Sequence, residues 1–144
     1  MLLLYSKGCE HALQALTQIS LEQKISGFSV RSVCRAAKVP ESFTRKVFQN
    51  LVKSGILAAR RGPGGGYRFR KDPTQVSVLD IIYAVDGKDA FEKCVIKDFR
   101  CDKKNFCPLH PMWMKARENM IGELKKSSVS GLVRKNKIKK EARR

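Results

Sequence analysis

One short run of residues most tightly limits what this chain can fold into. Positions 62–66 read Gly-Pro-Gly-Gly-Gly, which suits neither a helix nor a strand interior, because glycine loses the most backbone entropy on ordering and proline has no N–H to donate. The segments on either side, residues 56–61 and 67–71, are short and bounded by this turn signal. We therefore predict two strands joined by a glycine-rich turn.

Helical periodicity dominates the rest of the chain. Apolar residues recur at three- and four-residue intervals within residues 10–20, 30–38, 41–54 and 77–85. Ser29 and Ser77 are expected N-caps, and Gly55 stands where a helix C-terminus is expected. After Pro111, a long helix is predicted by an apolar stripe at Trp113, Ala116, Met120 and Leu124. The predicted fold class is mostly α with a small β-hairpin wing: a winged helix-turn-helix followed by a long C-terminal helix.

The positive charge of the chain is concentrated in two places. The 144 residues carry a formal net charge of +17. Residues 24–71 contain twelve Lys or Arg and one acidic residue, Glu41, and nine of the last twenty residues are basic. Such an excess favours a polyanionic partner, either nucleic acid or an anionic membrane surface. No apolar run approaches the roughly 18 residues of a membrane helix, and the first residues do not read as a signal peptide, so we expect a cytoplasmic protein.

The order helix, turn, helix and arginine-flanked glycine turn favours double-stranded DNA as the partner. The second helix of the pair would enter the major groove, while the wing would contact phosphates or a minor groove. Phe43, Val47 and Leu51 are expected to hold this helix to the domain. The predicted DNA-binding residues are Ser42, Thr44, Arg45 and Lys46 on the helix, and Arg60, Arg61, Gly64, Gly65, Tyr67 and Arg68 on the wing.

Three cysteines and a histidine lie close together in a segment of weak periodicity. Cys94, Cys101, Cys107 and His110 fall within seventeen residues, and three thiolates with an imidazole could hold Zn²⁺ or an iron–sulfur cluster. Structural zinc sites usually contain a more closely spaced cysteine pair, so the wide spacing favours the bulkier cluster. Cys34 is expected to be a core residue, whereas Cys9 could be exposed.

These motifs resemble those of the IscR/NsrR/RirA-like regulators, the Rrf-two family. The resemblance is carried by the wing, residues 61–69, by Leu-Val-Lys-Ser-Gly-Ile-Leu at 51–57, by His-Ala-Leu-Gln-Ala-Leu at 11–16, and by 78–82 with Asp86-Gly87. It implies a homodimer that crosses at the long C-terminal helix and reads an inverted-repeat operator. It also implies a [2Fe–2S] or [4Fe–4S] cluster on the three cysteines, with His110 as fourth ligand or, alternatively, Glu10 of the first helix.

The sequence thus predicts four parts and a regulatory role. They are a DNA-binding domain (1–87), a cluster loop (88–110), a dimerisation helix (111–128) and a basic, disordered tail (129–144). The expected function is transcription regulation, as a repressor whose operator affinity follows the state of an iron–sulfur cluster that senses iron, nitric oxide or redox state. The alternative is a DNA-binding regulator with structural zinc or no metal. No catalytic arrangement is evident, so we expect neither an enzyme nor a small-molecule substrate.

Overall fold

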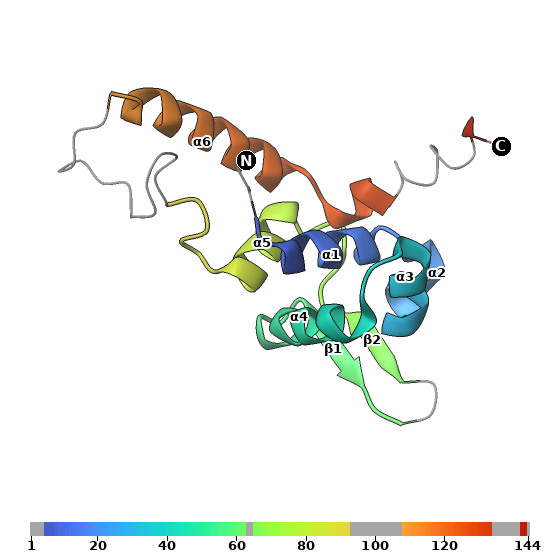
Figure 1. Ribbon diagram of the computed structural model, residues 1–144. Coiled ribbons are helices and arrows are strands. Elements are labelled where there is room, and N and C mark those ends of the chain that lie inside the picture. Colours follow the sequence, from blue (N-terminus) through green and yellow to red (C-terminus); the bar gives the residue numbers. More distant parts are fainter. Residues whose placement is uncertain (1–4, 63–64, 93–107, 134–141, 144) are drawn as a thin grey trace.

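The computed structural model describes residues 5–62, 65–92, 108–133 and 142–143. Within these ranges the chain is mostly helical with one antiparallel two-stranded sheet, as predicted (Figure 1). The elements are α1 (Lys7–Leu16), α2 (Leu21–Ser26), α3 (Val30–Ala37), α4 (Glu41–Lys53), β1 (Leu57–Arg60), β2 (Gly66–Phe69), α5 (Val78–Asp86) and α6 (His110–Lys126).

The helix ends follow local capping chemistry. The Ser29 side chain accepts a hydrogen bond at the start of α3, and Ser77 forms a capping box with Asp80 at the start of α5, so both predicted N-caps are confirmed. Gly55, which follows α4, has a φ of +78°, the left-handed conformation that favours glycine after a helix. These signals lie within a few residues of the ends they set, which is why the sequence reveals them.

The predicted helix over residues 10–20 is wrong at both ends. The structure has α1 at Lys7–Leu16 and, after a short turn, the separate helix α2 at Leu21–Ser26. Ser6 caps α1, and Ser20 forms a capping box with Gln23 at α2. A six-residue helix is less than two turns long, so it has no apolar periodicity by which it could be recognised.

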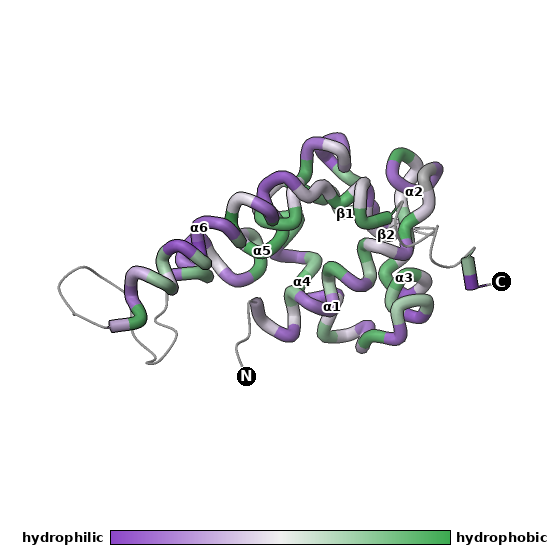
Figure 2. Tube along the Cα trace, turned by 90° about the horizontal axis from the view of Figure 1, so that it is seen from above, coloured by the Kyte–Doolittle hydropathy of each residue, from purple (hydrophilic) through white to green (hydrophobic). Residues whose placement is uncertain are grey.

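Helix α1 lies at the centre of the domain, in contact with α3, α4 and α5. Its Ala12 and Leu16 are buried together with Phe48 of α4 and with Ile81 and Ile82 of α5. The tube of Figure 2 is largely green along α5 and alternates between purple and green along α6. Helix α5 is therefore a core element, whereas α6 packs through one side only.

The wing is joined to the domain by a third backbone segment. Strands β1 and β2 pair antiparallel, with Arg60 opposite Gly66 at the turn. Beyond this pair, the Phe28 N–H donates to the Tyr67 carbonyl at 2.7 Å, and the Tyr67 N–H donates back to the Phe28 carbonyl at 2.9 Å. The position of the wing is therefore set by the segment that precedes α3 as well as by the turn.

Helix α6 lies on the opposite side of the molecule from the wing (Figure 1). Met120, Ile121 and Leu124 pack against the core, and Trp113 is buried, but Ala116 is exposed. Three residues of the predicted stripe therefore pack within this chain together with Ile121, Ala116 does not, and the dimer contact expected of this helix stays a prediction. No helix in the described ranges is long and apolar enough to cross a membrane.

The chain returns to the core after α6. The Val78 N–H donates to the Ser127 carbonyl at 2.8 Å, and the Val129 N–H donates to the Val76 carbonyl at 2.9 Å. Residues 129–133 are helical, with Val129 and Val133 buried. The prediction of a disordered tail from residue 129 is therefore wrong for this stretch, whose apolar side chains pack on the domain; residues 134–141 and 144 lie outside the described ranges.

Candidate functional site

Helix α4 turns Val47 and Leu51 to the core, as predicted, but not Phe43. Thr44, Val47, Phe48 and Leu51 are buried at the spacing of one helix face, whereas Phe43 is 45% exposed. Thr44 is 0% exposed, so its prediction as a DNA-reading residue is wrong, and so is the inward placement of Phe43. The Thr44 hydroxyl lies beside the Cys34 thiol, whose pKa burial raises and this hydroxyl partly lowers. Thr44 thus occupies a core position, although its polar side chain favoured an exposed one.

The exposed face of α4 presents Ser42, Arg45 and Lys46 to solvent. A guanidinium N–H of Arg45 donates to a carboxylate oxygen of Glu41 at 2.7 Å, and the other oxygen lies 3.5 Å from Nε of Arg31 on α3. The hydrogen bond from Arg45 lowers the pKa of the Glu41 carboxyl, and the charge of Arg31 lowers it further. Neither Arg31 nor Glu41 is among the predicted site residues, although the spacing of four residues between Glu41 and Arg45 predicts such a pair.

The wing residues divide into exposed and structural groups. Arg61 and Arg68 are exposed and Gly65 is half-buried, but the Arg60 guanidinium donates to the Ser26 carbonyl at the end of α2. Tyr67 is buried, with its ring edge-on to that of Phe48 at a centroid distance of 5.5 Å. Little of the Tyr67 side chain is thus left to contact DNA, although the residue also lines the hollow between α4 and the wing. Gly64 lies outside the described residues.

A surface hollow of about 330 Å³ lies between α4 and the wing. Arg45 of α4 lines it with Arg60, Gly62 and Gly65 of the wing, and with Ser29 and Val30 at the start of α3. Guanidinium groups and a helix N-terminus both attract anions. The hollow lies at the junction of α3, α4 and the wing, and the ribbon places the wing on the opposite side of the molecule from α6 (Figure 1).

Cys94, Cys101 and Cys107 lie outside the described residues, but both ends of their segment are fixed. Before it, Phe91 is buried against Tyr83 of α5, at a ring distance of 6.2 Å. The Arg117 guanidinium of α6 donates to the Phe91 carbonyl at 3.1 Å. After it, His110 is the first residue of α6. The segment therefore connects two helices that pack on each other.

The remaining cysteines are core residues. Cys9 and Cys34 are free thiols, 0% and 1% exposed, so Cys34 is buried as predicted and Cys9 is more buried than expected. Burial, with a smaller effect from the Asp86 charge, raises the pKa of Cys9 to about 12. A metal ligand must be a thiolate, which such burial disfavours. The described residues hold no group of three or more His, Cys, Asp or Glu side chains that could bind a metal ion.

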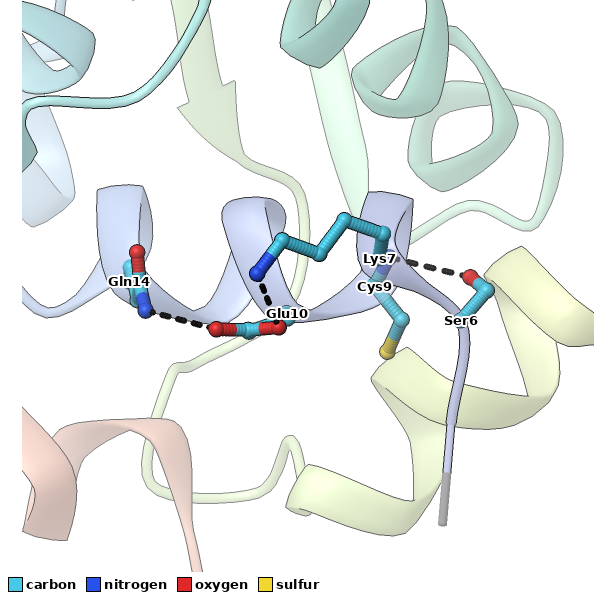
Figure 3. A network of polar contacts seen from close by, with 5 residues as sticks. All are labelled: Ser6, Lys7, Cys9, Glu10 and Gln14. Atoms are coloured by element: carbon cyan, nitrogen blue, oxygen red, sulfur yellow. Dashed lines mark hydrogen bonds and ion pairs between the residues drawn. The ribbon is translucent and has the colours of Figure 1, made fainter. Parts of the chain in front are cut away.

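The alternative ligand Glu10 sits in a small polar network on α1 (Figure 3). Its carboxylate accepts from Lys7 Nζ at 2.9 Å and from Gln14 Nε2 at 3.2 Å. The next residue, His11, has its ring edge-on to Phe43 at 5.8 Å. A carboxylate that is half-exposed and held by flexible side chains can exchange these partners for a metal ion at modest cost.

Comparisons with known proteins agree with this architecture. The family model described as Rrf2, iron-dependent transcriptional regulator, matches residues 5–135. The regulator IscR of Photorhabdus laumondii is 27% identical over 135 residues, which is 94% of this chain and 81% of IscR. The solved structure of CymR from B. subtilis matches with a TM-score of 0.71 at 19% identity, over 92% of this chain and 97% of CymR. That of T. potens IscR matches with a TM-score of 0.66 at 20% identity, over 91% of this chain and 86% of that one.

Proposed function

Since the chain belongs to the Rrf2 family of transcription regulators, a family of DNA-binding proteins rather than enzymes, we propose that it acts as a homodimer whose affinity for an inverted-repeat operator depends on an iron–sulfur cluster. The proposed DNA surface is the exposed face of α4 with the outer residues of the wing, namely Ser42, Arg45 and Lys46 together with Arg60, Arg61 and Arg68. The convergence of α4, the wing and the start of α3 on one arginine-lined hollow is the observation that supports it.

Arg45 provides the test of the DNA surface. Selection from a random pool of duplexes first identifies the sequence that the protein prefers. Arg45→Ala should then relax base preference at one position by about 1–3 kcal/mol in binding, because a bidentate arginine–base contact is lost. Lys115→Ala, an equal change of charge on the exposed side of α6, should leave preference unchanged. A uniform loss on every sequence would reassign Arg45 to phosphate contact.

The proposed cluster ligands are Cys94, Cys101 and Cys107 with His110 or Glu10. Two observations support this set: the other two thiols, Cys9 and Cys34, are buried, and three thiolates with one weaker ligand suit iron–sulfur ligation. Bound there, a cluster supplies iron that responds to iron supply, nitric oxide or oxidation. The segment joins α5 to α6, and α5 contacts α4. A change in how the segment is held would thereby reach the reading helix.

Anaerobic purification with visible absorption and metal analysis tests the cluster. We expect a coloured protein with iron and sulfide, and loss of the colour in Cys94→Ser but not in Cys34→Ala, where a small apolar residue replaces a buried thiol. One zinc per chain without iron would instead support the alternative of a structural zinc site. A colourless, metal-free protein would overturn cluster sensing and leave DNA binding intact.

His110 and Glu10 can be separated by the spectrum of the loaded protein. We favour His110, because it adjoins the cysteine segment at the first turn of α6, whereas Glu10 is already held by Lys7 and Gln14. His110→Ala should shift the absorption bands and lower iron content. Glu10→Gln, which preserves the size of the side chain, should change neither; the reverse result would assign Glu10.

The proposed dimer contact is the outer side of α6 at its start, where Leu109 and Met112 are 42% and 57% exposed. Two-fold pairing of this surface would present two wings to the two half-sites of an operator. Met112→Glu should convert a dimer to a monomer in sedimentation measurements, whereas Lys125→Glu, exposed and more than three turns further along the same helix, serves as the control. In cells, lower expression of a reporter gene placed behind the operator would identify the protein as a repressor. We propose that it acts in the cytoplasm.

A further inference from the structure

The proposed DNA surface contains one carboxylate in the middle of its arginines. Glu41 is the first residue of α4, and its two oxygens face two different cations: Arg45 at 2.7 Å on the same helix and Arg31 at 3.5 Å on α3. It is also the only acidic residue between positions 24 and 71. An acidic group here lowers the attraction of the surface for any polyanion, so it needs an explanation beyond helix stability.

The arginine that Glu41 holds is central to the surface. Arg45 lines the hollow between α4 and the wing, and about half of its side chain (51%) is solvent-exposed. A guanidinium has five N–H donors in a fixed plane, and the hydrogen bond to Glu41 involves the Nη2 group. Glu41 therefore orients Arg45 while other donors of the same plane remain for a further acceptor.

Two kinds of acceptor on DNA compete for those donors. A backbone phosphate carries a full negative charge and would lie close to the Glu41 carboxylate, whose pKa is lowered and which is therefore ionised at neutral pH. The edge of guanine presents two acceptors, N7 and O6, without a net charge. The carboxylate penalises the first more than the second.

We propose that Glu41 is a specificity-determining residue that directs Arg45 to a guanine edge and away from phosphate. This inference rests on the proposed DNA-binding function. It makes Glu41 a positioning residue: it acts through Arg45 and by repulsion of misplaced phosphates, and it need not touch a base. In its absence, Arg45 is free to follow the nearest phosphate, and the protein binds more DNA sequences with less discrimination.

The test compares Glu41→Gln with Glu22→Gln in the full-length protein. The amide introduced at position 41 still offers Arg45 an acceptor but removes the charge, and Glu22, exposed on α2, gives the same change of net charge elsewhere. For Glu41→Gln on a duplex of random sequence, we expect tighter binding and a plot of log affinity against log salt that is steeper by about 0.9, equivalent to one added phosphate contact. Preference for guanine at the Arg45 position should fall about tenfold.

Each result of this comparison has a defined meaning. If wild type selects a sequence and Glu41→Gln selects the same one with an unchanged salt slope, Glu41 has no role in specificity and only this inference fails. If both glutamine variants steepen the slope equally, the effect is one of net charge, which also overturns it. If wild type selects no sequence and binds no duplex, the proposed function itself fails.

Discussion

Gly66→Ala should destabilise the protein more than any other single methyl group added to the wing. A Cβ at position 66 would lie 2.1 Å from the Phe28 carbonyl oxygen, 3.0 Å from its carbonyl carbon and 3.3 Å from Cα of Ser29. All three atoms belong to the backbone, so no side-chain rotation relieves the overlap. The chain before α3 must move away from β2, which breaks the two hydrogen bonds between Phe28 and Tyr67.

The magnitude follows from what that movement removes. Each lost backbone hydrogen bond contributes about 1 kcal/mol net, and displacement of the buried Phe28 ring from the rings of Phe48 and Phe69 adds about 1–2 kcal/mol. The free energy of unfolding should therefore fall by about 3–4 kcal/mol. That is a large part of the roughly 5–15 kcal/mol available to a domain.

Gly122→Ala on α6 is the matched control, since the same methyl group there meets no atom within 4 Å. Alanine in a helix interior is better than glycine by about 0.5–1 kcal/mol, so this variant should be slightly more stable than wild type. Urea unfolding followed by circular dichroism measures both. A midpoint for Gly66→Ala within error of wild type, with an unchanged denaturant slope, would refute the steric reasoning and show that the wing yields to the added methyl group.

Three further predictions concern buried groups and the chain end. Iodoacetamide at about pH 8 should leave Cys9 and Cys34 unmodified in the native protein, because burial raises the pKa of both thiols and keeps them protonated. When the protein is first unfolded in urea, mass spectrometry should show both thiols modified. Modification of either thiol in the native protein would contradict its burial. Thr44→Val should change the free energy of unfolding by no more than about 1 kcal/mol, because the buried Thr44 hydroxyl has no hydrogen-bond partner in the described part of the chain, and it should leave duplex binding intact. A selective loss of sequence preference would show that Thr44 contacts a base after all. Truncation after Val133 should keep the wild-type melting temperature and flatten the salt dependence of DNA binding. Truncation after Leu124 should instead lower the melting temperature, because it removes the buried Val129. If the protein truncated after Val133 and the wild type have equal salt slopes, the removed basic residues contact no phosphate.

Local chemistry can be predicted from the sequence, whereas the buried face of α4 is predicted only in part. Ser77 and Gly55 act on their immediate neighbours, so their roles follow from residue type alone. On α4, however, Val47 and Leu51 can form one apolar stripe either with Phe43 or with Thr44 and Phe48. Apolarity alone places Phe43 inside and Thr44 outside, and tertiary packing places them the other way, since the buried face continues through Phe48.

The candidate site is predictable in outline only. The exposed arginines of α4 and the wing follow from the charge pattern. The structural contacts of Arg60 with Ser26 and of Tyr67 with Phe28 do not, because these partners are far away in the sequence. The high charge near the chain end also led to a wrong prediction of disorder for residues 129–133. Val129 and Val133 stand close to many basic residues, which favours a disordered tail, although both side chains are buried.

Two contacts tie α6 to α5. At the middle of α6, the Arg117 guanidinium donates to the Phe91 carbonyl just beyond the end of α5, and just after α6 the Ser127 carbonyl accepts from the Val78 N–H at the start of α5. Helices α5 and α6 are thus joined at two separate points as well as by their packing. We therefore expect a displacement of α6 to be transmitted to α5, and through α5 to α1 and α4, which it contacts.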